Sequence, residues 1–465
     1  MHKLGMILCA GIINLALWGV PPAQAQKKSV AEEILDILRA DGKISEAQYR
    51  DLRAKAQAEN EAREAGVEAF RRDSAKDVRK AIDWLNRFTF SGDLRVRHEG
   101  FYQDRVKARN RERFRLRFGS QLKISDELTA GFRIASGELN DPISSNQTMG
   151  DLFNRKPIGI DQIYVTVTPG ETFGLGDWPW KPLSVTAGKM SNTLFRPRAV
   201  LESEMIWDGD VTPEGLAETF TLFQASEGPL RRLQLNAIQW SVDEAGITAD
   251  SFFIGGQFVG AFKPLPRLDA TLGLGDYYLT SSRRAAQERN TNSSLNMTNS
   301  VVLKNGTVVI GGAPFRPNPN NPIRKFFGGF NLLNASLQMQ WDTGYAKWPL
   351  SFFVDFVHNT EAETEEDTAV WVGLGLGQTR EQGDWSFAAI WARTETDAVL
   401  SEFSYSDFGR NGGTNLQGPF VAINYMILPR LTLTAKNHFV NFIHRPAGAS
   451  NSMVYRFQLD AQLTF

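Results

Sequence analysis

The chain has 465 residues, a formal net charge of −1 and a mean hydropathy of −0.29. This near-neutral charge gives no indication of nucleic-acid binding or of attraction to an anionic membrane surface. After the N-terminus no stretch has the roughly 18 consecutive apolar residues of a membrane-spanning helix, which excludes a helical membrane protein. A β-barrel stays open, because its strands alternate in polarity and their hydropathy averages out.

Residues 1–25 have the pattern of a secretory signal peptide. Lys3 supplies the positive start, an apolar stretch follows, and Ala23-Gln24-Ala25 is a small-x-small cleavage site. The alternative is a membrane anchor or an ordinary N-terminal helix. Cys9, the single cysteine, lies inside this segment. The mature chain would therefore have no disulfide, thiolate nucleophile or cysteine-ligated metal.

Residues 26–87 are predicted to form a helical periplasmic segment. Apolar residues over 34–38 follow helical spacing, Asp41-Gly42 breaks that helix, and Ser45 with Gln48 forms a capping box for the next one. The remainder is rich in Ala, Glu, Arg and Lys. Three interpretations stay open: a coiled coil with further copies of the chain, packing against the barrel mouth, and a solvated linker.

From residue 88 to residue 465 the period of the apolar residues changes to two. Over 111–124, one strand face carries phenylalanine and leucine and the other carries arginine. An arginine facing lipid at the bilayer midplane costs roughly 2–4 kcal/mol, so the arginine face is expected to line a water-filled lumen. The pore-lining residues predicted in this way are Arg95, Arg97, Arg113, Arg115, Arg117 and Arg133.

The fold class predicted is all-β, an antiparallel transmembrane β-barrel of 16 strands, with 18 strands as the alternative. Met205–Val211 has the pattern of a further strand, but single-chain bacterial barrels have even strand numbers and both termini in the periplasm. Residues 191–216 are therefore expected to form the third extracellular loop. The strands are expected near 90–99, 111–124, 128–137, 158–168, 182–190, 217–226, 232–241, 251–263, 267–280, 329–341, 349–358, 367–378, 384–396, 416–427, 431–441 and 453–465.

The third loop carries acidic side chains that are expected to line a pore constriction, namely Glu202, Glu204, Asp208, Asp210 and Glu214. If the loop folds inward, these acids face the arginine row, and the field across the narrow lumen favours polar solutes. The alternative is that the arginines pair with neighbouring lumen acids only to balance their charge. The longest loop, 281–328, contains a hairpin signal at Asn305-Gly306, which suits a type I′ turn.

No catalytic, cofactor or metal site is predicted. None of the five histidines has metal-ligand spacing. The glycine alternation over 373–377 lies within a strand, so it is not a phosphate loop. Glycine opposite Leu374 and Leu376 indicates a smooth lumen wall or a tight subunit contact. The chain ends on Phe465 after apolar residues at every second position, which resembles the signature by which outer-membrane proteins reach the barrel-assembly machinery. Phe465 is the expected assembly signal.

Several phrases together resemble a family of bacterial putative porins. They are the helical pair over 34–52, Ser91-Gly92-Asp93-Leu94-Arg95-Val96-Arg97, the loop phrase over 140–148, and Trp207-Asp208-Gly209-Asp210 with Thr212-Pro213-Glu214-Gly215. The resemblance covers nearly the whole mature chain. It implies passive diffusion through a barrel in the outer membrane of a Gram-negative-type bacterium, and it brings no catalytic residues.

The expected function is therefore a porin for small hydrophilic solutes and ions, in outer-membrane lipid and as a homotrimer. The alternative is a structural anchor, in which the N-terminal helices bind peptidoglycan or oligomerise and the barrel only holds them in the membrane. The two hypotheses differ in one observable, because an anchor with a plugged lumen would not conduct.

Overall fold

The computed structural model describes residues 30–244, 249–292, 297–311, 318–410, 412–446, 448–450 and 452–465. The signal peptide expected at residues 1–25 lies outside the described residues. The chain divides into two compact units, one ending at Asn86 and the other spanning Arg87–Phe465. Among the described helices, none combines the length and the apolar character that a membrane crossing requires.

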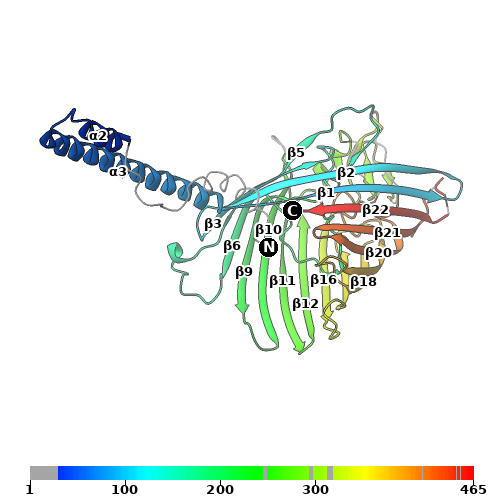
Figure 1. The fold of residues 1–465 in the computed structure, drawn as a ribbon. Coiled ribbons are helices and arrows are strands. Elements are labelled where there is room, and N and C mark those ends of the chain that lie inside the picture. Colours follow the sequence, from blue (N-terminus) through cyan, green and yellow to red (C-terminus); the bar gives the residue numbers. More distant parts are fainter. Residues whose placement is uncertain are drawn as a thin grey trace. The chain divides into compact units, whose positions relative to one another are not determined.

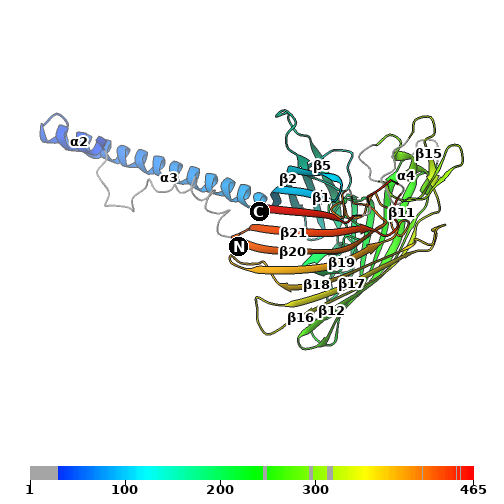
Figure 2. The same ribbon diagram turned by 90° about the vertical axis from the view of Figure 1, so that its right-hand side faces the viewer.

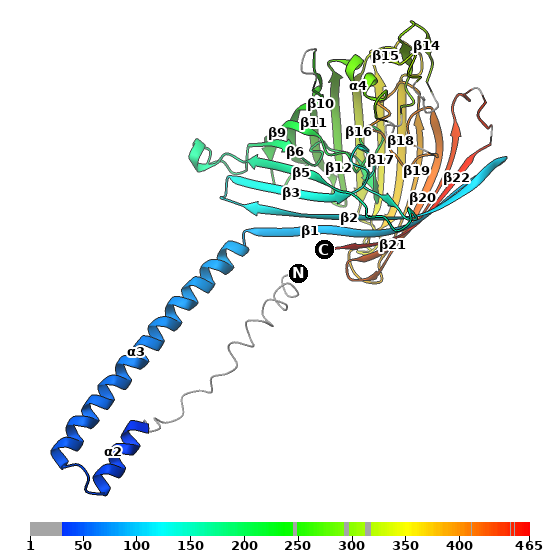
Figure 3. The same cartoon turned by 90° about the horizontal axis from the view of Figure 1, so that it is seen from above.

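The first unit consists of helix α2, Val30–Ala40, and helix α3, Glu46–Leu85. Figure 3 shows α2 folded back along α3. The capping box is present: Ser45 N–H donates to Gln48 Oε1 at 2.9 Å, and Gln48 N–H donates to Ser45 Oγ at 3.3 Å. Phe70, farther along α3, is 75% exposed. Beyond the hairpin, α3 thus has apolar surface that the described residues of its own unit leave exposed.

Deletion of residues 30–86 is expected to leave barrel formation intact, because this unit contributes no strand and the barrel closes on its own edges. The deleted protein should still migrate faster on gels before heating than after it. A matched deletion of the last strand, residues 454–464, should abolish that difference. If the helix deletion abolishes it as well, the helices are required for the barrel to fold.

The second unit is a closed antiparallel barrel of 16 strands, so the predicted strand number is confirmed and the alternative of 18 is wrong. The wall strands are β1 (Phe88–Gln103), β2 (Val106–Lys123), β3 (Leu128–Ser136), β5 (Ile158–Val167), β6 (Leu183–Lys189), β9 (Glu214–Gln224), β10 (Leu230–Asp243), β11 (Ser251–Leu265), β12 (Leu268–Leu279), β16 (Asn331–Trp341), β17 (Leu350–Asn359), β18 (Thr368–Gly377), β19 (Trp385–Thr394), β20 (Leu416–Leu428), β21 (Leu431–Phe442) and β22 (Val454–Thr464). Met205–Val211 is not a wall strand, as expected.

The barrel closes where β22 pairs with β1, with Asp460 opposite Arg97. In Figure 1, β22 in red lies beside β1 in blue. Phe465 extends this seam by one residue. Its carbonyl oxygen accepts a hydrogen bond from Gly92 N–H at 2.9 Å, and its own N–H donates to the Gly92 oxygen at 3.1 Å. The C-terminal residue therefore takes part in closing the barrel.

Side chains alternate between the lumen and the outer face, as the period of two predicts. On β1, Leu94 and Val96 are 42% and 47% exposed on the outer face, whereas Arg97 on the lumen face is 1% exposed. On β18, Leu374 and Leu376 are exposed and the glycines face the buried side. This pattern gives the barrel an apolar outer surface and a charged interior.

Loop 3, which we define as residues 190–213, folds into the barrel. It contains two short strands, β7 (Arg198–Ala199) and β8 (Leu201–Glu202). Ala199 is fully buried and lies over Gly375 of β18, where an added Cβ would stand 2.7 Å from the Ala199 carbonyl carbon. The glycine is needed for this close approach. Of the two interpretations of the glycine alternation, the smooth lumen wall is therefore the one that the structure supports.

Two aromatic clusters hold loops inside the lumen. Trp207 of loop 3 makes edge contacts with Trp240 and Phe253, at centroid distances of 5.3 and 5.1 Å. Tyr405 belongs to loop 7, defined as residues 395–415, and its ring lies 5.6 Å from that of Trp371. Apolar packing thus fills part of the lumen and holds loops 3 and 7 inside the barrel.

Loop 2 is defined as residues 137–157 and loop 5 as residues 280–330. Loop 2 includes β4 (Gln147–Thr148), which pairs with β2. In loop 5, β13 (Val301–Leu303) pairs with β14 (Val308–Val309), so the predicted hairpin is confirmed, and β15 (Ile323–Phe326) adds a third strand. The expected type I′ turn is wrong, because Gly306 has a positive φ and Asn305 does not. Helix α4 (Ser282–Glu288) and β15 lie at the end of the barrel opposite the C-terminus (Figure 2). The turn between β5 and β6 contains a short 3-10 helix, Glu171–Phe173.

Candidate functional site: a charged constriction

Five of the six arginines of the predicted row lie on β1 and β2, and Arg133 lies on β3. The register places Arg95 opposite Arg115 and Arg97 opposite Arg113. Antiparallel pairing with alternating side chains thus brings four guanidinium groups to one patch of the wall. Such a patch is stable only if anions or water compensate it, and the structure shows which groups do so.

Arg97 is fully compensated by two carboxylates. Its Nε and Nη2 atoms donate to the two oxygens of Asp460 at 2.7 and 2.8 Å, and its Nη1 donates to Asp407 at 2.8 Å. Asp460 comes from β22 and Asp407 from loop 7. The guanidinium therefore joins the barrel seam to a loop inside the lumen. Arg97 thus has a structural role in addition to its expected role in lining the pore.

Arg115 and Arg117 share their anions. Their Nε atoms donate to the two oxygens of Asp93 at 2.8 and 2.6 Å. On their other side, Asp210 of loop 3 lies 3.5 Å from Arg115 and 3.3 Å from Arg117. Burial opposes ionisation of Asp210, but Arg115 and Arg117 outweigh it and lower the pKa of this carboxyl to about 2. Loop 3 thus presents an ionised acid directly to the basic wall.

Arg95 and Arg113 have weaker compensation. Arg95 donates to Asn146 Oδ1 at 2.7 Å, and the carboxylate of Asp460 is 4.0 Å away. Arg113 donates to Ser144 Oγ at 3.2 Å and to the Asn146 backbone oxygen at 3.1 Å. Among the described residues, the Nε atoms of both arginines lack a hydrogen-bond partner. These two positions retain the most unbalanced positive charge of the row.

A cavity of about 180 Å³, here called the arginine cavity, lies between the wall and loop 3. Its charged lining combines part of the predicted arginine row, three of the predicted loop acids, and two further residues from loop 7 and β21. They are Arg95, Arg97, Arg115, Arg117, Glu204, Asp208, Asp210, Asp407 and Lys436. Acidic loop and basic wall therefore meet across this cavity, and Asp210 provides the ion pairs between them.

Several predicted site residues lie elsewhere. Arg113 is next to the cavity but does not line it, and Arg133 is paired with Asp161 of β5. Glu202 pairs with Arg196 of its own loop at 2.7 Å. These three residues do not line the arginine cavity, and their expected place along the pore stays a prediction.

Glu214 needs a further correction, since it is not in the loop at all. It is the first residue of β9, stands opposite Lys189 in the register, and pairs with it at 2.8 Å. The loop ends three residues earlier than the expected boundary at 216. Backbone pairing with β6 extends β9 to Glu214, so this residue belongs to the barrel wall and not to loop 3.

Sequence reasoning missed the acids that balance the row. Asp93 and Asp460 were on the polar faces of the first and last strands, so alternation could have identified them. Lys436 was likewise on an expected strand. Asp407 and Tyr405 come from a loop with no periodicity, and no local signal could have placed them beside Arg97. Among the described residues, no group of three or more His, Cys, Asp or Glu is arranged to hold a metal ion.

A closed antiparallel barrel with charged side chains in its lumen and an apolar outer face defines a class of protein, the outer-membrane channels. The chain matches the family described as "Putative porin" over residues 101–258 and 329–463, which is more than half of its length. The chain belongs to this family. It is a porin of the outer membrane, with a channel for the passive diffusion of small hydrophilic solutes and ions. No curated protein matches the chain.

Solved porin structures have a similar fold at low sequence identity. OprB of Pseudomonas putida is 14% identical, with a TM-score of 0.52, covering 83% of this chain and 96% of that one. OmpF of Salmonella typhi is 8% identical, with a TM-score of 0.47 and coverages of 81% and 97%. An anion-selective porin from Comamonas acidovorans is 11% identical, with a TM-score of 0.44 and coverages of 81% and 99%. At 14% identity the likeness to OprB concerns the fold alone.

Proposed function

We propose that the arginine cavity is the constriction of this porin and that its charges select among permeating solutes. The observation that carries the proposal is the position of Asp210. It lies on a loop inside the barrel, 3.3 Å from Arg117 and 3.5 Å from Arg115 on the wall. Charges of opposite sign across a narrow aqueous gap produce a transverse field, which aligns water and favours solutes with their own dipoles or charges.

The wall is expected to act through Arg95 and Arg115 in particular. Arg95 is the least compensated arginine that lines the cavity, and Arg115 faces it in the register. A unit charge about 5 Å from a permeating ion contributes roughly 0.8 kcal/mol in water, which is about a fourfold change in local ion concentration. This is large enough to measure, and salt screening should reduce it.

Replacing both residues, as Arg95→Ser with Arg115→Ser, is therefore expected to shift ion selectivity towards cations at low salt, by about fourfold for each of the two charges removed. The measurement is the reversal potential of single channels in a planar bilayer under a KCl gradient. The shift should shrink towards molar salt, where the screening length is about 3 Å. The control is Arg133→Ser, which removes a lumen arginine that is paired outside the cavity and should change little.

The outcomes separate the hypotheses. An unchanged reversal potential in the double variant at low salt would mean that the arginine cavity does not lie on the conducting path. A wild-type protein that inserts but never conducts would instead favour the structural anchor, an alternative that the family membership does not favour.

The surroundings of the channel are part of the same proposal. The chain would enter the envelope of a Gram-negative bacterium after removal of residues 1–25, and the barrel-assembly machinery would read Phe465. The barrel would form a homotrimer in outer-membrane lipid. Exposed Val67 and Phe70 on α3 leave apolar surface for contact with further copies in the periplasm. The same helices are expected to contact peptidoglycan. The proposed function includes no catalysed reaction.

A further inference from the structure

A second cavity, here called the acidic cavity, lies on the long-loop side of the constriction. Its volume is about 360 Å³, within the range of roughly 300–1,000 Å³ that small-molecule sites occupy. Loops 2, 3, 5 and 7 all contribute to its lining, together with the adjoining strand ends. Asp210 lines both this cavity and the arginine cavity, so the two adjoin at that residue.

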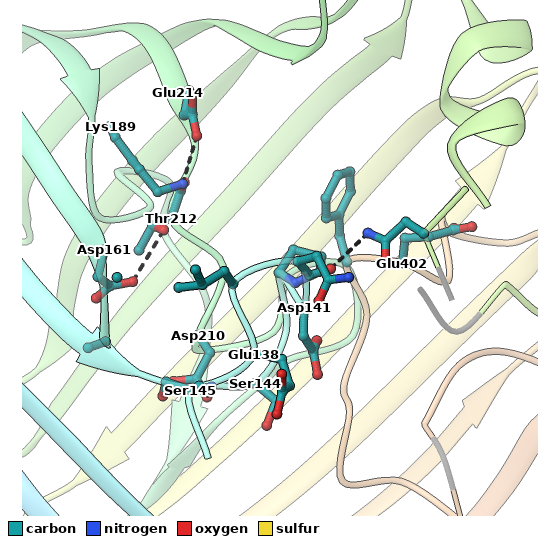
Figure 4. A pocket seen from close by; sticks show the side chains of 18 of the residues that line it. Glu138, Asp141, Ser144, Ser145, Asp161, Lys189, Asp210, Thr212, Glu214 and Glu402 are labelled. Carbon is teal, nitrogen blue, oxygen red and sulfur yellow. Dashed lines mark hydrogen bonds and ion pairs between the residues drawn. The ribbon is translucent and has the colours of Figure 1, made fainter. Parts of the chain in front are cut away.

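The charges around the acidic cavity are strongly unbalanced. Eight carboxylate side chains and one cationic side chain, Lys189, line it. Lys189 is already paired with Glu214, and Figure 4 shows this pair on the other side of the cavity from Glu402. Asp161, Asp210 and Asp243 are each paired with arginines outside the cavity. These pairs leave four carboxylates for which the described residues provide no ion pair, and they are Glu138, Asp141, Glu288 and Glu402.

Glu402 is the most informative of the four. Only 5% of this residue is exposed, although it lines the cavity. Its Oε2 accepts a hydrogen bond from Ser401 Oγ at 3.1 Å, whereas Oε1 has no partner among the described residues. A buried carboxylate oxygen without a donor is costly. A cationic donor placed in the cavity would remove that cost.

The pKa values of the loop carboxyls agree with a missing cation. Burial raises the pKa of Glu402 to about 7 and that of Asp141 to about 6. Burial outweighs the attraction of Arg289 for Glu402 and of Arg113 for Asp141, so the anionic form of each group stays disfavoured. A positively charged guest next to them would favour ionisation and gain binding energy from it.

The lining identifies the kind of cation. The four carboxylates without an ion pair are spread over loops 2, 5 and 7, and no group of three described acidic side chains is arranged to hold a metal ion. Leu139, Leu400 and Phe403 also line the cavity and offer apolar contact. A lining that combines separated anionic groups with hydrocarbon matches a chain of methylene groups that carries ammonium groups at intervals.

We propose that the acidic cavity binds aliphatic polyamines. Their ammonium groups pair with Glu402 and Asp141, and their methylene spacers lie along the apolar side chains. Because the cavity adjoins the constriction, a bound polyamine reduces the ion current. This last consequence rests on the proposed channel function, whereas the binding itself does not.

The test is isothermal titration calorimetry of the full-length, detergent-solubilised barrel with spermidine and putrescine at low salt. Both amines are expected to bind. 1,4-Butanediol, the neutral counterpart of putrescine, should give no heat, and Mg²⁺, with the same charge as putrescine, should bind much more weakly. Glu402→Gln should weaken binding about tenfold or more, since it removes a charge-assisted hydrogen bond.

The matched control is Glu365→Gln, an exposed acid on the same side of the barrel that does not line the cavity. It should bind as the wild type does. If Glu402→Gln fails to fold, Asp141→Asn at a half-buried position serves instead. Equal affinity of Glu402→Gln (or that substitute) and Glu365→Gln would overturn the proposal, as would Mg²⁺ binding as tightly as putrescine, because either result means diffuse charge attraction.

Single-channel recording completes the test. Spermidine added on the long-loop side should reduce the wild-type current and affect Glu402→Gln much less. A channel that conducts but shows no polyamine binding by calorimetry would end this inference and leave the porin function standing. A wild-type protein that binds polyamine but does not conduct would contradict the channel proposal alone.

Discussion

Replacing Arg97 with methionine is expected to lower the free energy of unfolding of the barrel by about 3–5 kcal/mol, because it leaves buried carboxylates without their cation. Arg97 is 1% exposed and holds Asp460 through two hydrogen bonds of 2.7 and 2.8 Å. It also binds Asp407 at 2.8 Å. Methionine has similar length and no charge, so lost packing contributes little. The measurement is reversible urea unfolding in lipid vesicles, followed by tryptophan fluorescence.

The control for this experiment is Arg105→Met. Arg105 lies in the turn between β1 and β2, its side chain is 90% exposed, and its contact with Asp104 is 3.6 Å. An exposed pair contributes roughly 0–1 kcal/mol, so this variant should stay close to the wild type. Adding Asp460→Asn to Arg97→Met should recover part of the loss by neutralising one stranded carboxylate. Equal stability of Arg97→Met and Arg105→Met would show that water in the lumen compensates these acids.

Deletion of Phe465 is expected to leave most of the chain outside the outer membrane while synthesis continues normally. The deletion removes the two backbone hydrogen bonds with Gly92, which are worth together roughly 1–3 kcal/mol. It also removes the ring that lies over Gly92 and 6.3 Å from the ring of Phe118. The measurement is the amount of folded, heat-modifiable barrel in outer-membrane fractions compared with total protein.

Two further measurements distinguish recognition from closure of the seam. Phe465→Trp keeps an aromatic end and should assemble nearly as well as the wild type. The deletion variant should also be refolded in detergent from urea. Efficient refolding there, with failure in cells, would assign Phe465 to recognition by the assembly machinery. Normal membrane levels of the deletion variant would contradict both roles.

The sequence by itself determined the architecture of this protein. A strand has a side-chain period of two, and lipid excludes guanidinium groups, so the alternation of Arg113, Arg115 and Arg117 with apolar residues was sufficient to orient β2. The requirement for an even strand number then excluded Met205–Val211 from the wall. The capping box at Ser45 and the Asn305-Gly306 turn are likewise local signals, because the residues that interact are close in the sequence.

Only the tertiary structure decided which charges meet. Arg97 finds Asp460 at the barrel seam, 363 residues away, and Asp407 on a loop 310 residues away. Alternation places Asp460 on the polar face of its strand, but no sequence pattern pairs it with Arg97. The loop that carries Asp407 has no periodicity at all. The inward course of loop 3 likewise depends on Trp207 packing against two distant strands and on Gly375 admitting Ala199. Each predicted loop acid therefore lies where it reaches a cation: Asp210 at the arginine cavity, Glu202 within its own loop and Glu214 on β9. The packing of the whole barrel determines which cation each acid reaches.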